Sequence, residues 1–580
     1  MMRRLFPSSS DEAGPQRKKI DRHGGGPTHP NLEEHCAELP GCTASVDKEP
    51  SSAGAFAPGV ATESQSWPSI LRCIMSERRE GLGQQCRNIR LQTGYSGIGS
   101  IGRVLTEMDI GFVEDAGVEI KKSACHFCRQ NRTLPTHWFQ DMEEVVRLGA
   151  GSCWQHKKHC TLPLARPDLL VSGFPCRPYS RQRPGSSCET DRADHIDFKK
   201  TQWAIQHFAK VRPHMALFEN VEGFASRGPD DTVETSHLDE FCEQLRGLGY
   251  SVAWGVLDLT PWIAANSTRV YIWCVDSMLE SAGSLPAGGG PAVVHTGPPL
   301  PTLAERVKAL AAATQTARTG MAREPLGSIF LRPSSTAWLN NVGIQGFAGD
   351  IPSGYLGEDD PDSAWARQAQ VLRERWGRAG RPESGARSWT DPTVGSRPAL
   401  RGVPVPVAPR RKEILNLFFL WACYQRAVSP SDPAARSVAA HDLVADTSQN
   451  PSRHPWSHGL KRFCRSSRPY VYELDRELVP VEGFRAFGWR NASLNGLTPS
   501  ACWDLLGDSM ALQTLAVATT SLLYVVGSRL EGTWSATSVT TGNALEAADC
   551  GGGGGPAAVA LEHNSVRSRA RHAVVASAPP

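Results

Sequence analysis

The stretch that decides the fold is NIRLQTGYSGIGSIGRVLTEM, residues 88–108. Residues 88–97 have the pattern of a strand that runs into a glycine turn, and residues 100–108 have the pattern of a helix. The glycines around the junction are Gly94, Gly97, Gly99 and Gly102. A glycine-rich turn between a strand and a helix lets the backbone approach a ligand at the helix N-terminus. The stretch therefore predicts a cofactor-binding loop at the edge of an α/β sheet.

Strand and helix patterns continue to alternate after this loop. Residues 111–120, 166–174 and 214–221 read as apolar strands, and residues 236–249 read as an amphipathic helix closed by a glycine. Two late strands follow at 250–259 and 268–275. Such alternation predicts a Rossmann-like, doubly wound, mostly parallel sheet with helices on both faces, and ligands at the carboxyl ends of its strands.

Composition divides the 580-residue chain into five segments. The strand and helix patterns predict a core at 85–280, and a short helical block at 465–534 is expected to complete it. Residues 281–464, rich in Pro, Gly, Ala and Arg, predict a variable, irregular and partly disordered insert. The tails at 1–84 and 535–580 are expected to be disordered.

Charge and hydropathy limit the partners. The net charge of +3 is nearly neutral, so a nucleic-acid surface must be a local patch. Residues 361–412 hold 10 Arg and 1 Lys against 4 acidic residues, together with three tryptophans, which suits either a nucleic-acid surface or a solvated basic loop. The apolar run at 510–527 carries Gln, Thr and Ser and predicts a packed helix, so we expect no membrane partner. No obligate protein partner is inferred.

Two features of the sequence indicate the cellular compartment of the protein. The 16 cysteines form no regular framework, which is typical of reduced intracellular thiols. Arg3-Arg4 and Arg17-Lys18-Lys19 have the form of a two-part nuclear import signal, although a solvated basic tail fits the same residues. We therefore expect a nuclear protein.

Three reactive side chains follow strands of the predicted sheet. Glu119 stands at the end of the second strand, where a ribose diol would need an acceptor. Cys176 follows the next strand in a loop stiffened by prolines and rich in arginine, which favours a nucleophilic thiolate over a buried inert thiol. Glu219 ends a further apolar strand, where a carboxylate is costly unless it has a partner or a function.

The order and wording of these motifs resemble the cytosine-5 DNA methyltransferase family. YSGIGS (95–100) is similar to its cofactor motif, SGFPCRPYS (172–180) to its Pro-Cys loop and FENVEGF (218–224) to its Glu-Asn-Val motif. RELVPVEGFRAFGW (476–489) and LLGDSMALQTLAV (505–517) are similar to its last two motifs. The resemblance implies the class I methyltransferase fold, with a target-recognition region in the insert.

The resemblance also implies a reaction and a catalytic set. The thiolate of Cys176 would add to carbon 6 of a cytosine flipped out of DNA, while Glu219 would hydrogen-bond ring nitrogen 3. Carbon 5 would then take a methyl group from S-adenosylmethionine and lose its proton, and the sulfur would be expelled. Asn220 would hold the loop, and Arg269 would help to hold the cytosine and the glutamate.

Further site residues are carried over from the family by position. Ser180, Arg181 and Arg183 would grip DNA phosphates. Glu119 would bind the ribose of the cofactor and Asp141 its adenine. The whole expected cofactor set is Tyr95, Ser96, Gly97, Ile98, Gly99, Glu119, Ile120, Asp141, Met142, Pro175, Asp508 and Ser509.

The chain departs from the family pattern at several positions. Arg177 and Asp508 stand where Gln and Asn are usual. Of a Gln-x-Arg-x-Arg pattern only Arg269 remains, with Ala265 and Ser267 at the other places. Two alternatives to a DNA methyltransferase therefore stay open: a transfer-RNA cytosine-5 methyltransferase, or a catalytically weakened DNA-binding homologue.

A zinc site is a separate interpretation. Cys125-x-x-Cys128 and Cys153-x-x-His156 have the spacing of paired zinc ligands, with His159 and Cys160 adjacent. The alternative is that Cys125 and Cys128 lie on a helix and the rest forms a surface loop. Since chance matches to this pattern are frequent, the sequence analysis assigns no metal ligand.

Overall fold

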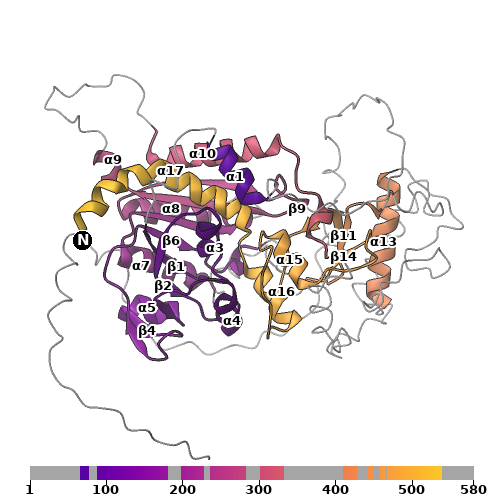
Figure 1. The fold of residues 1–580 in the computed structure, drawn as a ribbon, viewed down its shortest axis with the longest axis horizontal. Coiled ribbons are helices and arrows are strands. Elements are labelled where there is room, and N and C mark those ends of the chain that lie inside the picture. The colour runs from indigo at the N-terminus through magenta and orange to yellow at the C-terminus, as the bar shows by residue number, and fades with distance from the viewer. Residues whose placement is uncertain are drawn as a thin grey trace, which may run out of the picture. The chain divides into compact units, whose positions relative to one another are not determined.

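The computed structural model of the chain describes residues 66–76, 88–180, 197–226, 235–282, 301–331, 409–426, 438, 440–448, 456–465 and 467–537. Its centre is a seven-stranded sheet in the order β3-β2-β1-β6-β7-β10-β8 (Figure 1). The strands are β3 (His137–Phe139), β2 (Phe112–Val118), β1 (Ile89–Gly94), β6 (Leu169–Ser172), β7 (Met215–Val221), β10 (Thr268–Asp276) and β8 (Tyr250–Asp258).

All neighbouring strands of this sheet are parallel except β10, which runs antiparallel to both β7 and β8. The predicted doubly wound, mostly parallel, Rossmann-like sheet is confirmed. The carboxyl ends of β1, β2, β6 and β7 meet at one edge, and this edge carries the motifs singled out in the sequence.

Alternate side chains of each central strand enter different cores. On β6, Leu169 and Val171 pack into one core and Leu170 into the other. Because successive strand side chains point to opposite faces, this pattern requires helices on both sides of the sheet. One face carries α3 (Ser100–Glu107), α10 (Leu303–Thr319) and α17 (Leu512–Thr537); the other carries α5 (Met142–Leu148), α7 (Phe198–Val211) and α8 (His237–Gly247).

Local sequence fixes where some of these helices begin. Ser236 accepts a hydrogen bond from the backbone of Asp239, and the Asp239 carboxylate accepts one from the backbone of Ser236. This capping box starts α8 at His237, and Thr302 with Glu305 starts α10 in the same way. Each cap satisfies backbone N–H groups that the helix leaves unpaired, which stabilises it by about 1 kcal/mol.

The β3 edge of the sheet carries a small hairpin. Strands β4 (Ala150–Ser152) and β5 (His159–Thr161) pair antiparallel, and Phe139 bridges to Cys153 next to them. Helix α4 (Lys122–Asn131) connects β2 to β3. Its buried residues Cys125 and Cys128 pack with Trp138 of β3.

A second, four-stranded antiparallel sheet has the order β12-β11-β14-β15. Its strands are β12 (Trp456–His458), β11 (Leu443–Asp446), β14 (Pro469–Val471) and β15 (Arg476–Glu477). Helix α13 (Pro409–Gln425) buries Phe418 and Phe419 against it. The short strand β13 (Leu460–Lys461) pairs parallel with β9 (Ala265–Asn266), which links this part of the chain to the strand leading into β10.

The remaining described elements are short helices and 3-10 turns. They are α1 (Trp67–Ser76), α9 (Ser277–Ala282), α15 (Pro480–Ala486), α16 (Pro499–Asp508) and the 3-10 turns η3 (Arg177–Tyr179), η4 (Glu222–Ala225) and η5 (Leu326–Ile329). Residues 499–527 are long and apolar enough to cross a membrane, but 89% of their most apolar window is buried inside the fold. Helix α17 is thus the packed core helix that the sequence predicts.

Three segment boundaries differ from those predicted. Helix α1 lies within the expected disordered tail 1–84, yet Trp67 and Leu71 are buried and Trp67 Nε1 donates to the carbonyl of Gly488 at 3.3 Å. Helix α10 lies within the expected insert 281–464, yet it packs beside α17 on the central sheet (Figure 1). The apolar side chains of both helices pack into the core. The segments that contain the two helices are polar overall, so their composition did not predict either helix.

The third boundary separates the insert from the block at 465–534. Strands β14 and β15 of that block pair with β11 of the insert, so the predicted boundary cuts through one sheet. Helix α17 also continues to Thr537, past the expected start of the C-terminal tail. The basic, tryptophan-containing stretch 361–412 lies almost wholly outside the described residues, as do the N-terminal basic clusters.

Candidate active site

The glycine-rich loop joins β1 to α3 through left-handed backbone conformations. Tyr95, Gly97 and Gly99 have φ values of 52°, 54° and 71°. A Cβ at position 99 would lie 2.2 Å from Nη1 of Arg132, so only glycine fits there. The loop therefore turns tightly enough to present its backbone to the cavity below it.

Glu119 immediately follows β2 and is tied to this loop. Its carboxylate accepts hydrogen bonds from the backbone N–H of Gly97 and of Lys121, both at 2.8 Å. Burial raises the pKa of Glu119, while these two N–H donors oppose the shift. The acid is thus held in a fixed orientation at the mouth of the loop.

The Pro-Cys loop follows β6 and is held by the next strand. Asn220 on β7 donates from Nδ2 to the carbonyl of Phe174 at 3.2 Å, and its own oxygen accepts from the backbone of Val221 at 2.8 Å. A Cβ on Gly173 would lie 3.5 Å from Oε2 of Glu219. Cys176, two residues after Phe174, is half-buried and starts the 3-10 turn η3. Its sulfur therefore stands on a loop whose first residues are held by β7.

Glu219 pairs with an arginine from the antiparallel strand β10. Nε of Arg269 lies 2.6 Å from Oε1 of Glu219, and both side chains are almost fully buried. Nη1 of Arg269 also donates to the hydroxyl of Ser267 at 3.2 Å. The buried carboxylate is therefore neutralised by one cation, and its second oxygen remains for a further partner.

A second arginine reaches this pair from a distant part of the chain. Nη2 of Arg462 lies 3.8 Å from Sγ of Cys176. Burial lowers the pKa of Arg462, and so does the charge of Arg269. Among the described residues it makes no carboxylate ion pair within 4 Å, so its charge faces the sulfur and Glu219. No motif in the sequence predicted a site role for Arg462.

The backbone pairing explains how Arg462 gets there. Lys461 on β13 is opposite Asn266 on β9 in the parallel register. Arg462 directly follows β13, and Ser267, the position where the family pattern has an arginine, directly follows β9. Since β9 and β13 are far apart in sequence, no local spacing could have indicated this neighbour.

Charged side chains from α4, α16 and the segment after β13 close one side of the site. Arg465 pairs with Asp508 at 2.6 Å, and Lys121 lies between Asp504 and Asp508. A Cβ on Gly507 would lie 2.5 Å from the backbone nitrogen of Arg465, so the two segments are in close contact. Asp508 is thus a charge partner at the cavity wall.

One cavity of about 320 Å³ unites these features. Thirteen of the predicted site residues line it: Tyr95, Gly97, Ile98, Glu119, Ile120, Asp141, Met142, Pro175, Cys176, Glu219, Arg269, Asp508 and Ser509. Arg462, Arg465, Lys121 and Trp203 line it as well and were not predicted. The cavity runs from the glycine-rich loop to the cysteine.

Some predicted residues lie elsewhere. The hydroxyl of Ser96 is buried, 2.6 Å from Oγ1 of Thr93, and accepts from the backbone of Val118, so this side chain shapes the loop from behind. Gly99 caps α3 and Asn220 lies behind the Pro-Cys loop. Ser180 ends the described part of that loop outside the cavity lining, and Arg181 and Arg183 lie outside the described residues.

The paired spacing proposed for zinc does not bring its four residues together. Cys125 and Cys128 lie on α4, where burial raises the pKa of Cys125 to about 12 and that of Cys128 further. Cys153 and His156 instead gather with His137 and Cys160. His159 pairs with Glu144. The helical alternative for Cys125 and Cys128 is confirmed.

The cavity suits a nucleoside cofactor at its glycine-rich end. A buried acid at the end of β2 provides an acceptor for a ribose diol, and backbone with positive φ gives close access. Ile120 is 70% exposed although it is apolar, and Asp141 lies near it on the cavity wall. An exposed apolar side chain beside an acid is a suitable surface for an adenine ring. The fold and the site together define a class I methyltransferase.

Comparison with known proteins finds a matching family model for part of the chain. Residues 95–291 match the family model described as C-5 cytosine-specific DNA methylase. The match covers less than half of the chain, and over these residues the chain is similar to that family, whose members use S-adenosyl-L-methionine as the methyl donor. No curated protein matches the chain.

Three solved structures were found to be similar. They are Dnmt2 of S. pombe (14% identity, 75% of this chain and 99% of that chain, TM-score 0.33), the methyltransferase EhMeth of Entamoeba histolytica (11%, 76% and 98%, 0.34) and a triple mutant of DNMT2 from Spodoptera frugiperda (11%, 75% and 100%, 0.34). The likeness to the family therefore rests on the sequence match over residues 95–291 and on the motifs, which meet in one cavity.

Proposed function

We propose that this chain methylates carbon 5 of cytosine in DNA through a covalent bond to Cys176. The observation that carries the proposal is the cavity itself, which is lined by Cys176, the Glu219–Arg269 pair and Glu119. A nucleophile, an acid group and a nucleoside-binding end within one cavity form the minimum set for this reaction.

The proposed chemistry begins at the sulfur. The Cys176 thiolate adds its electron pair to carbon 6 of an extruded cytosine, and the electrons of the 5,6 double bond move to carbon 5. A proton shared between the Glu219 carboxyl and ring nitrogen 3 stabilises this redistribution, while Arg269 holds the carboxyl in place. S-adenosylmethionine supplies the methyl group. Loss of the carbon 5 proton then reforms the double bond and expels the thiolate.

Arg462 has a defined part in this proposal. Its guanidinium lies 3.8 Å from the sulfur, and its segment follows β13, the partner of the strand that precedes position 267, where the family pattern has an arginine. A cation there attracts the negative charge of the thiolate and the charge that builds up on the ring as the bond forms. We infer that Arg462 replaces the missing arginine from another strand, which argues for catalysis and against a degenerate homologue.

The substrate is tested by transfer of labelled methyl groups. Purified full-length protein is given labelled S-adenosylmethionine with either duplex DNA or transfer RNA, and incorporation is measured in each. We expect label in DNA and its loss in Cys176→Ala. Label in transfer RNA alone would overturn the DNA assignment, and label in neither would support the non-catalytic alternative.

Cys464→Ser is the matched control for this experiment. Cys464 lies near the site, but burial raises its pKa to about 11, so it stays a thiol near neutral pH. This variant is expected to keep the transfer activity, which separates loss of the nucleophile from disturbance of the site. The nuclear location expected from the N-terminal basic clusters remains a prediction, to be checked by imaging of the intact chain.

A further inference from the structure

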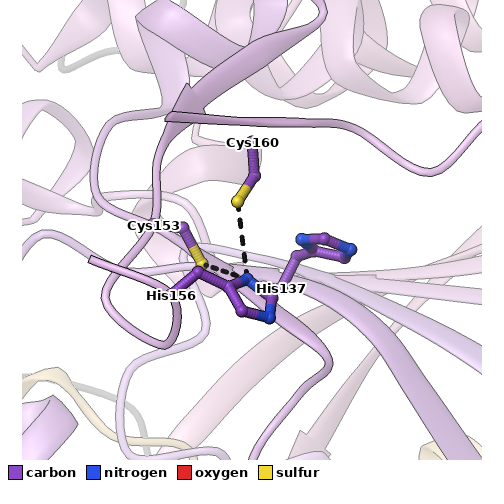
Figure 2. A group of neighbouring side chains, drawn as sticks. All are labelled: His137, Cys153, His156 and Cys160. Carbon is purple, nitrogen blue, oxygen red and sulfur yellow. Dashed lines mark hydrogen bonds between the residues drawn. The ribbon is translucent and has the colours of Figure 1, made fainter. Parts of the chain in front are cut away.

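Four potential metal ligands gather at the β3 edge of the sheet, away from the catalytic cysteine. They are His137 on β3, Cys153 and His156 in the turn of the β4–β5 hairpin and Cys160 on β5. Their ligand atoms all lie within 4.8 Å of one another, and Figure 2 shows the four side chains gathered around one point. Neither the reaction nor the cofactor site uses them.

Two of the distances between ligand atoms match those around a tetrahedral ion. Nδ1 of His156 lies 3.5 Å from Sγ of Cys153 and 3.4 Å from Sγ of Cys160. Zinc bonds of about 2.3 Å to sulfur and about 2.0 Å to nitrogen place neighbouring ligand atoms about 3.4–3.8 Å apart. One imidazole nitrogen has a single lone pair or a single hydrogen, so it cannot form good hydrogen bonds to two thiols at once. An ion shared by all three atoms accounts for both distances.

The second histidine adds an independent observation. The rings of His137 and His156 have centroids 4.9 Å apart. Nδ1 of His137 is buried and has no hydrogen-bond partner among the described residues. A buried imidazole nitrogen without a partner is unfavourable, and coordination of the ring orients it and offsets that cost.

The surrounding backbone supports the sulfur ligands. The backbone N–H of Trp138 donates to Sγ of Cys153 at 3.2 Å, as expected for a sulfur that carries thiolate charge. The turn is closed by hydrogen bonds between the backbones of Cys153 and Lys158 and of Lys157 and Cys153, with Lys157 at a φ of 55°. The hairpin is thus shaped to bring Cys153, His156 and Cys160 to one side.

We propose that His137, Cys153, His156 and Cys160 bind a zinc ion that pins the β4–β5 hairpin to the edge of the central sheet. Two thiolates and two neutral imidazoles suit Zn²⁺ in charge and softness. All four positions of the tetrahedron are filled by the protein, so the ion is structural and has no open position for catalysis.

The site is connected to the cofactor end of the cavity. Trp154, next to the ligand Cys153, donates from Nε1 to the backbone carbonyl of Glu119 at 2.8 Å. The backbone N–H of Gln140, which precedes Asp141, donates to Ser152 of β4 at 2.9 Å. Loss of the ion is therefore expected to loosen both residues that face the nucleoside and to weaken cofactor binding.

Metal content of the intact, tag-free protein tests the proposal directly. Mass spectrometry of the elements is expected to find about one zinc per chain, as a filled four-ligand site requires. Replacement by cobalt should give the visible bands of a tetrahedral ion together with thiolate-to-cobalt charge transfer. Protein that carries no zinc and takes up no cobalt would overturn the proposal, and so would a disulfide between Cys153 and Cys160 in freshly purified protein.

Variants locate the ion. Cys160→Ser and His137→Ala are expected to lose the bound zinc, whereas His159→Ala, which changes an exposed side chain on the same hairpin, is expected to keep it. Cys128→Ser tests the pairing that the sequence suggests and should also keep the zinc. If the ligand variants fail to fold, release of zinc from the wild-type chain on titration of its thiols supplies the same answer. Retention of zinc by a folded Cys160→Ser variant would contradict the assignment.

Discussion

The two walls of the active-site cavity are built in different ways. One wall consists of residues on or after strands of the central sheet: Glu119 after β2, Cys176 after β6, and Glu219 on β7. The other consists of Arg462 and Arg465 after β13 and Asp508 at the end of α16. The residues of the first wall, which we call the strand-order wall, are positioned by the strands that carry or precede them. The residues of the second wall are positioned by contacts between segments far apart in the sequence.

The two walls differ in whether a charged residue can be supplied from another part of the chain. A residue of the strand-order wall depends on one backbone position at the end of its strand, so no other residue can take the place of Cys176. A cation brought by the second wall needs only to reach the same point in space, and Arg462, which directly follows β13, reaches the sulfur of Cys176. The second wall can therefore supply what the first wall lacks.

Apart from loss of the nucleophile itself, the largest effect is expected for Arg462→Ala, which removes the cation beside the sulfur. The methyl transfer rate should fall on the order of a hundredfold, since removal of one preorganised donor commonly has this effect. Lys461→Ala, one residue earlier on β13, should cost far less. The measurement is single-turnover methyl transfer at saturating cofactor.

A double variant sharpens this prediction. Arg462→Ala combined with Ser267→Arg returns the cation to the strand that leads into β10, and we expect it to recover part of the lost rate. If Ser267→Arg gives no recovery, or if Arg462→Ala alone leaves the rate unchanged, Arg462 does not replace an arginine at position 267.

A smaller effect is expected for Glu119→Ala in the strand-order wall. The substitution removes the acceptor for the ribose hydroxyls and leaves the N–H groups of Gly97 and Lys121 without their partner. S-adenosylmethionine binding should weaken by about 1–3 kcal/mol. Calorimetric titration measures this directly, and an unchanged affinity would remove Glu119 from the cofactor site.

The stability of the fold that carries the strand-order wall should also depend on pH through His207, which is buried on α7 next to Gly94. Burial lowers the pKa of His207 from 6.5 to about 4. Between these values only the unfolded chain binds the proton, so stability falls as the pH drops through this window. The loss should amount to about 2 kcal/mol between about pH 7 and about pH 5.

Urea unfolding at the two pH values measures this loss. His207→Gln cannot take up the proton, so its stability should change less over the same interval than that of the wild type. Equal pH dependence in the two proteins would show that His207 is not the responsible group.

The smallest effect is expected in the second wall, for Asp508→Asn. Asp504 remains beside Lys121 and Arg465, and the side chain of Asp508 is 30% exposed. Solvent screens such pairs, so the stability should change by less than about 1 kcal/mol. Thermal unfolding and cofactor titration should both stay near the wild-type values, and a large loss in either would mean that this network fixes the wall.

The sequence predicts the strand-order wall well for a physical reason. Parallel strands end at one edge, so the positions after β1, β2 and β6 must converge wherever they stand in the chain. The same reasoning finds Cys176, Glu119 and Glu219 but not Arg462, because the pairing of β13 with β9 leaves no periodic or local signal. Helix α10 was missed for a related reason, since its apolar residues are diluted by a polar, proline-rich surrounding.

The zinc ligands show the same limit. Spacing alone suggested Cys125 and Cys128 as partners of Cys153 and His156, but the backbone of α4 carries them to the core beside Trp138. His137 is brought in by the pairing of β3 with β2, which the sequence does not mark. Spacing identifies which side chains can bind a metal, and the sheet decides which of them meet.

The central claim is that the sulfur of Cys176 bonds to the cytosine. Duplex DNA carrying 5-fluorocytosine cannot lose the group at carbon 5, so the covalent intermediate is trapped when S-adenosylmethionine is present. Mass spectrometry of the digested complex is predicted to place the nucleotide on the peptide that contains Cys176 and on no other cysteine. A trapped nucleotide on a different residue, or no covalent complex with DNA that is bound, would contradict the account.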